Sequence, residues 1–195
     1  MLFNTIKLSL LIVFALLLQA CQSSFIVDQT SHYARAIGII NQFEVTRWHH
    51  RVIGTNNRIS VVSDAIDNVD VIFLSEVIAK GLAPYFNHVQ GGASKDAIDD
   101  AIALTKVHGN NYLVYVEVAD LNAVIEPDTV KPTTNYSRIQ LILTVVDVVS
   151  SSTVEKILLS ANTQHWSFWG DEMPGLLAKP VAFVGNSLTG YRAVN

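Results

Sequence analysis

Apolar and polar residues alternate most regularly in two neighbouring segments, residues 138–149 and 154–166. In the first segment the aliphatic side chains occupy every second position, which is the period of a strand that buries one face. These side chains belong to Ile139, Leu141, Leu143 and Val145. Three serines at 150–152 separate the two segments and are typical of a turn. The pattern therefore predicts a β-hairpin.

Further upstream, the spacing of apolar residues becomes that of a helix. Six of them form one stripe between positions 73 and 85. They are Phe73, Leu74, Val77, Ile78, Leu82 and Tyr85. Aspartates at 64, 67 and 70 precede this stripe, where the helix dipole favours negative charge. A second helix is expected after Ser94, as its N-terminal cap, with Gly109 or Asn110 as its C-terminal stop.

Short segments at 59–62, 88–90 and 112–118 predict strands around these two helices. A last helix is expected within 174–188. The predicted order is β-α-β-α-β-β-β-α. This order indicates an α+β fold, with a mixed sheet packed by helices in a single domain over residues 58–195.

The segment before this domain, residues 21–57, is interpreted as a polar tether and N-terminal extension. Within it, residues 43–48 are compatible with either a strand or a helix, because neither period is clean. A second irregular stretch, residues 120–135, contains Pro127 and Pro132 and is predicted to be a long connection. Long ordered loops often carry function, so this connection is a candidate surface.

Residues 1–20 have the pattern of an export signal peptide. Lys7 is the only charged residue among them, and an apolar run from Leu8 to Leu18 follows it. The run is about half of the ~20 residues that a membrane-spanning helix needs, so the segment is excluded from the fold. The next residues, Leu18-Gln19-Ala20-Cys21, resemble the lipobox of bacterial lipoproteins. That resemblance implies cleavage before Cys21 and acylation of its sulfur and amino groups.

Composition supports a lipid anchor in place of a disulfide framework. Cys21 is the only cysteine in 195 residues, so the chain forms no internal disulfide. Acylation of this cysteine would hold the protein on a membrane, because several acyl chains suffice for stable anchoring. Gln22 follows where an aspartate would favour the inner membrane by the sorting rule of such lipoproteins, so the outer membrane is expected. The formal net charge of −4 argues against nucleic acid as a partner.

Two segments carry a resemblance to known proteins. Residues 109–114 join a helix to a strand through Gly-Asn-Asn-Tyr-Leu-Val, and residues 166–171 read Trp-Ser-Phe-Trp-Gly-Asp before Pro174. With these motifs the chain resembles a family of uncharacterised bacterial lipoproteins, domain of unknown function 4823, over residues 58–188. Trp169 stands where that family would have glycine. The predicted topology is also similar to the N-terminal domain of TolB and related envelope lipoproteins. The resemblance implies no catalytic residues.

No catalytic motif is present, and the candidate groups each have a simpler interpretation. His49 and His50 are adjacent, so on a strand they point to opposite faces and chelate a metal poorly. The aspartates at 64, 67 and 70 lack the spacing and glycine of an EF-hand. His165 and Asp171 lie near each other in sequence, but no nucleophile accompanies them. We therefore expect no enzymatic activity, no metal and no cofactor.

Two aromatic segments remain as candidate contact surfaces. Trp166, Phe168 and Trp169 are the preferred one, because tryptophan is enriched at protein interfaces. The alternative is that these rings cap the core under the last helix. Residues 47–51, Arg-Trp-His-His-Arg, also have side chains that can touch lipid headgroups or a partner, but five residues are weak evidence for such a contact. The sequence thus predicts an outer-membrane lipoprotein that acts in the periplasm as a non-enzymatic protein-binding or assembly module. The alternative is a lipoprotein that binds a small ligand or a glycan.

Overall fold

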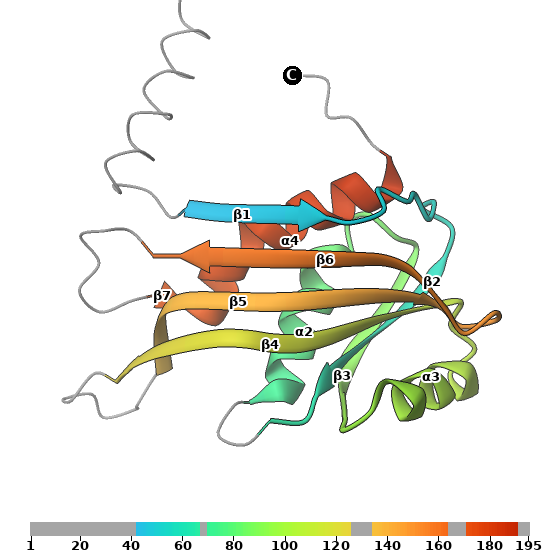
Figure 1. The fold of residues 1–195 in the computed structure, drawn as a ribbon, viewed down its shortest axis with the longest axis horizontal. Coiled ribbons are helices and arrows are strands. Elements are labelled where there is room, and N and C mark those ends of the chain that lie inside the picture. The colour runs from blue at the N-terminus through green and yellow to red at the C-terminus, as the bar shows by residue number, and fades with distance from the viewer. Residues whose placement is uncertain (1–41, 67–69, 126–133, 164–170, 191–195) are drawn as a thin grey trace, which may run out of the picture. The chain divides into compact units, whose positions relative to one another are not determined.

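A computed structural model describes residues 42–66, 70–125, 134–163 and 171–190 of the chain (Figure 1). These residues form one sheet of seven strands and three helices. The strands are β1 (Gln42–Arg47), β2 (Arg58–Asp64), β3 (His88–Lys95), β4 (Tyr112–Ile125), β5 (Thr134–Asp147), β6 (Ser152–Asn162) and β7 (Asp171–Glu172). The helices are α2 (Val71–Leu82), α3 (Ile98–Val107) and α4 (Met173–Thr189).

The sheet is mixed, as the sequence predicts. Its strand order is β1-β6-β5-β4-β2-β3, and β7 pairs with β5. Strand β2 runs parallel to both β3 and β4, and the remaining pairs are antiparallel. Each parallel neighbour is reached through a helical crossover, α2 before β3 and α3 before β4. The α+β class and the predicted order of elements are confirmed.

The helices cover the sheet on both faces. Val61 belongs to the larger core under α2 and α4, whereas its neighbour Val62 belongs to a smaller core under α3. Because adjacent residues of a strand point to opposite faces, α3 lies on the other side of the sheet from α2 and α4. In Figure 1, α4 runs behind β1 and β6. The predicted hairpin is confirmed, since Ile139, Leu141, Leu143 and Val145 are all fully buried.

Several local expectations change in the structure. Residues 43–48, left open between strand and helix, lie mostly in β1, an edge strand paired with β6. Ser94 is not a helix cap: it lies in β3, which continues to Lys95, and α3 begins after Ala97. The connection predicted over 120–135 is shorter, because β4 and β5 pair as far as Ile125 and Thr134. No helix in the described part of the chain is long and apolar enough to cross a membrane.

Candidate functional site

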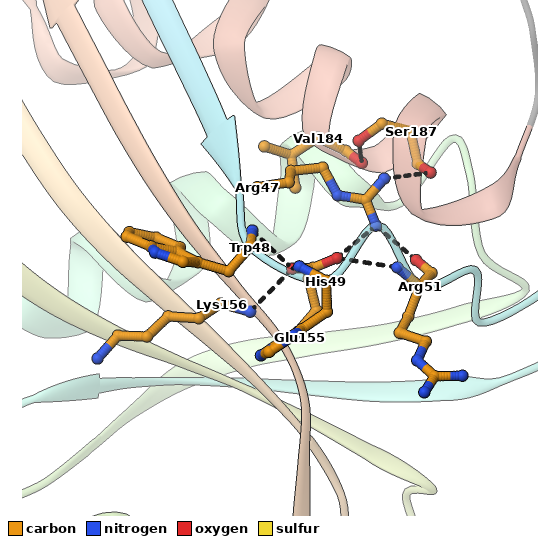
Figure 2. A network of polar contacts seen from close by, with 8 residues as sticks. All are labelled: Arg47, Trp48, His49, Arg51, Glu155, Lys156, Val184 and Ser187. Atoms are coloured by element: carbon orange, nitrogen blue, oxygen red, sulfur yellow. Dashed lines mark hydrogen bonds and ion pairs between the residues drawn. The ribbon is translucent and has the colours of Figure 1, made fainter.

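The turn that follows β1 is organised around one buried carboxylate (Figure 2). Glu155 on β6 is fully buried, and its Oε2 pairs with the guanidinium of Arg47 at 2.8 Å. Arg47 also donates from Nη1 to the carbonyl of Ser187 on α4 at 2.9 Å. These contacts join the end of β1 to β6 and to α4.

The same carboxylate accepts hydrogen bonds from the backbone of the turn. The N–H groups of Trp48 and His49 donate to Oε1 at 3.1 Å and 2.8 Å. The N–H of Arg51 donates to Oε2 at 3.0 Å. Both oxygens are thereby satisfied, and the backbone between 48 and 51 is fixed by a side chain more than one hundred positions away. His50 adopts φ 53°, which lets the chain reverse between the bonded N–H groups.

The electrostatics of this carboxylate follow from its partners. Burial by itself disfavours the charged form and would raise the pKa of Glu155. The backbone N–H groups of His49 and Arg51, together with the Arg47 guanidinium, outweigh burial and hold the pKa below its ordinary value. Glu155 is therefore an ionised anchor for the turn, with a structural role.

The opposite side of the turn faces solvent. Trp48 is 52% exposed and Val52 is 59% exposed. His49, His50 and Arg51 between them are exposed as well. The buried carboxylate thus holds a short loop, which we call the 48–52 loop, with one aromatic, one aliphatic and three basic or imidazole side chains outward.

The stretch of sequence that contains this loop is basic. Between Glu44 and Asp64 the sequence contains no acidic residue, but it contains three arginines and two histidines. Arg47 is compensated by Glu155, whereas Arg51 and Arg58 are exposed. A hollow of about 470 Å³ beside the loop is lined by Asp147, among others. That carboxylate accepts hydrogen bonds from the N–H groups of Val149 and Ser150 and so caps the hairpin turn.

A second feature is a groove between α2 and α4, of about 520 Å³. Its lining is largely apolar: Phe73, Val77, Gly81, Pro84, Tyr85, Pro174, Ala178 and Ala182, with Glu76 and Lys80 beside them. Phe73 is 41% exposed. The helices approach closely below the groove, because Gly81 packs on Val181 and Gly185 packs on Tyr85.

Elsewhere among the described residues, two titratable groups make local structural contacts. Tyr115 donates its hydroxyl to Asp64 at 2.9 Å, and burial followed by this bond raises the pKa of the phenol. Asp70 caps α2 by accepting from the N–H of Phe73. Among the described residues no group of three or more His, Cys, Asp or Glu could hold a metal ion. Of the three aspartates considered above, Asp64 and Asp70 belong to no such group, and Asp67 lies outside the described residues.

Most of the site residues that the sequence predicts fall outside the part of the chain that the structure describes. Cys21, Trp166, Phe168 and Trp169 are outside the described residues, and so is His165. Asp171 and Glu172 form β7 and pair with β5. The importance of Glu155 was missed, because a single glutamate in an alternating strand carries no local signal. The one available signal was that Glu155, a charged residue, occupies a position that the alternation of β6 assigns to the buried face.

Comparison with known proteins identifies the fold. Neither a protein-family model nor a curated protein sequence matches the chain. The chain is similar in structure to the PelC dodecamer from Paraburkholderia phytofirmans, with a TM-score of 0.55 and 14% identity, over 76% of this chain and 98% of that chain. At this identity the likeness establishes a shared fold.

Two further structures have lower TM-scores. Lipoprotein GNA1162 from Neisseria meningitidis gives 0.35 at 15% identity, over 68% of this chain and 99% of that chain. TolB from Acinetobacter baumannii gives 0.32 at 10% identity, over 76% of this chain and 29% of that chain. The resemblance to the family of domain of unknown function 4823 stays a prediction.

Proposed function

We propose that the protein is a lipid-anchored component of the bacterial cell envelope, on the periplasmic side of the outer membrane, and that it acts through contact with other protein chains, without catalysis. The lipobox ending at Cys21 supports the anchor. The observation that carries the contact role is the apolar groove between α2 and α4, whose wall includes the partly exposed Phe73. An open apolar surface of this kind is typical of interaction sites.

The occupant that we favour is a second copy of this chain. PelC, whose fold this chain shares, is described as a dodecamer. Glu76 and Lys80 stand one helical turn apart beside the groove and carry opposite charges, so two copies related by a twofold axis can pair them across an interface. The groove volume also lies within the range of small-ligand pockets, which supports the alternative of a small-ligand or glycan-binding protein.

The test is the mass in solution of the full mature chain carrying Cys21→Ala, measured by light scattering over a range of concentrations. We expect a multiple of the monomer mass for this chain. Ala178→Lys places a charge in the groove and should shift the mass to that of the monomer. Val107→Lys is the matched control, because Val107 is 82% exposed on α3, away from the groove.

A monomer at every concentration would overturn self-assembly. If the Ala178→Lys variant keeps the mass of the oligomer, the interface between copies lies outside the groove. The groove would then be the candidate site of the small-ligand alternative. That alternative is then tested by whether glycans or amphiphiles raise the melting temperature of the parent chain and fail to raise that of the Ala178→Lys variant.

A further inference from the structure

We propose that the 48–52 loop is a membrane-contact surface that binds anionic phospholipid headgroups. This inference rests on the membrane location proposed above, but it concerns a different surface from the α2–α4 groove. The loop lies at the end of edge strand β1, and its residues Trp48, His49 and Arg51 are exposed there (Figure 2).

The side chains of the loop match the chemistry of a bilayer surface. Trp48 offers an amphipathic ring of the type that is enriched at membrane–water interfaces. Arg51 offers a planar guanidinium that pairs with phosphate through two parallel hydrogen bonds. Val52, 59% exposed, adds apolar area next to the cation. An aromatic, a cation and an aliphatic group side by side suit the boundary between headgroups and acyl chains.

The shape of the loop is fixed before any contact is made. Glu155 accepts hydrogen bonds from the N–H groups of Trp48, His49 and Arg51, so the backbone of the loop faces the carboxylate and the side chains face outward. A loop that is already ordered loses little conformational entropy on binding. The loop therefore presents its exposed side chains in a fixed arrangement before it meets a surface.

Charge complementarity decides for an anionic surface. The stretch from Val45 to Ser63 is free of acidic residues, although acidic residues outnumber basic ones in the whole chain. The exposed Lys156 on β6 flanks Trp48, which donates its N–H to the carbonyl of that lysine. The acids near the loop are Glu155, which is paired with Arg47, the exposed Glu44 at the middle of β1, and Asp147, whose carboxylate accepts from backbone N–H groups of the hairpin turn. Such a basic zone on an acidic protein orients it toward negative lipid.

The covalent anchor permits this contact. The 20 residues from Gln22 to Asn41 separate Cys21 from β1. A chain of this length spans at most about 70 Å when fully extended. Because this reach exceeds the length of β1, either end of β1 can face the membrane, and the preference of the loop for lipid would then set the orientation of the domain.

The experiment uses the full mature chain with Cys21→Ala, so that binding by the loop is measured without the acyl chains. Vesicles of phosphatidylcholine alone, and vesicles of phosphatidylcholine mixed with phosphatidylglycerol, are sedimented with the protein. We expect binding to the anionic vesicles only, and we expect added salt to weaken it. Arg51→Gln should weaken binding by about five-fold, the effect of one cation near an anionic surface. Trp48→Ala should also weaken binding, because it removes the interfacial ring.

Lys179→Gln is the matched control, since Lys179 is an exposed cation on α4, and it should bind as the parent does. The melting temperature of each variant is measured first, because exposed side chains should leave the fold intact. Equal binding by all variants, or no binding to anionic vesicles, would overturn the proposal. Loss of binding on adding inorganic phosphate at constant ionic strength would also overturn it, in favour of a free-anion site. Failure of the proposed function appears separately, in the acylation of Cys21 and in the mass of the oligomer.

Discussion

A single buried carboxylate determines how the chain enters the sheet. Removing a carboxylate from water is costly, and this cost is offset only when the charge is paired and hydrogen-bonded. Glu155 meets both conditions through Arg47 and the backbone of the 48–52 loop. Because Arg47 is itself largely buried, neither partner can be removed without leaving an uncompensated charge inside the molecule.

Substitution of this residue should therefore be among the most damaging for stability. Glu155→Gln removes the charge, leaves Arg47 unpaired and turns one amide NH₂ toward backbone N–H donors. We expect the free energy of unfolding in urea to fall by about 3–5 kcal/mol. Glu44→Gln, which changes an exposed glutamate of β1, should alter it by no more than about 0.5 kcal/mol. Similar losses in the two variants would show that the buried pair contributes nothing specific.

The pH dependence of the unfolding free energy provides a second test with the Glu155→Gln variant. The pKa of Glu155 is lower in the folded chain than its ordinary value, so the folded state binds fewer protons at this site than the unfolded state does. The resulting stabilisation is complete above the unfolded pKa and is lost as the pH falls through the folded pKa. The difference in unfolding free energy between parent and Glu155→Gln should therefore shrink on acidification. A difference that is constant with pH would assign the effect to shape alone.

At the scale of elements, the contact between α2 and α4 depends on two glycines. A Cβ on Gly81 would lie 2.5 Å from Cγ1 of Val181, and a Cβ on Gly185 would overlap the ring of Tyr85. Real Cβ atoms do not approach so closely, so the helices can be this near only because the glycines lack side chains. The groove is lined by residues of these same two helices, and Gly81 belongs both to its lining and to the close contact.

Gly185→Ala should consequently destabilise the protein. Overpacking of a tight helix contact costs roughly 1–3 kcal/mol, measured as a fall in the free energy of unfolding. Gly175 is in the same helix with no atom within 4 Å of an added Cβ. Gly175→Ala should therefore be neutral or stabilising by up to ~1 kcal/mol, because alanine has the higher helix propensity. If both alanine variants were equally stable, the close approach of α2 and α4 would be wrong.

The elements that the sequence predicts well are those whose signal is local. The alternation over 138–149 identifies the hairpin, and the apolar stripe over 73–85 identifies α2, because each pattern repeats within one element. Strand β1 is ambiguous from sequence because its six residues are held by pairing with β6, a strand that is distant in the sequence. Ser94 looks like a helix cap, but pairing with Ser63 keeps it in β3. The Arg47–Glu155 contact joins residues 108 positions apart and has no local signature.

At the scale of the whole molecule, the two proposed contact surfaces are formed by different residues. The groove belongs to the helical layer of α2 and α4, whereas the 48–52 loop lies at the end of β1, at the edge of the sheet. A chain that contacts lipid through the loop therefore leaves its helical layer available to a second copy. The two proposed contacts are compatible because they use separate residues, and each can be removed without the other.

The position of the whole molecule in the cell is the last point that can be tested. The lipobox implies that Cys21 receives the acyl chains, so labelling with a fatty-acid probe should mark the parent chain and fail on Cys21→Ala. Labelled parent protein should fractionate with the outer membrane, since Gln22 does not carry the retention signal. Gln22→Asp should stay labelled and move to the inner-membrane fraction, which separates sorting from anchoring. Several acyl chains hold a protein on a bilayer stably, so Cys21→Ala should appear mainly in the soluble periplasmic fraction. Equal labelling of the parent and Cys21→Ala would end the lipoprotein interpretation, whatever the two surfaces bind.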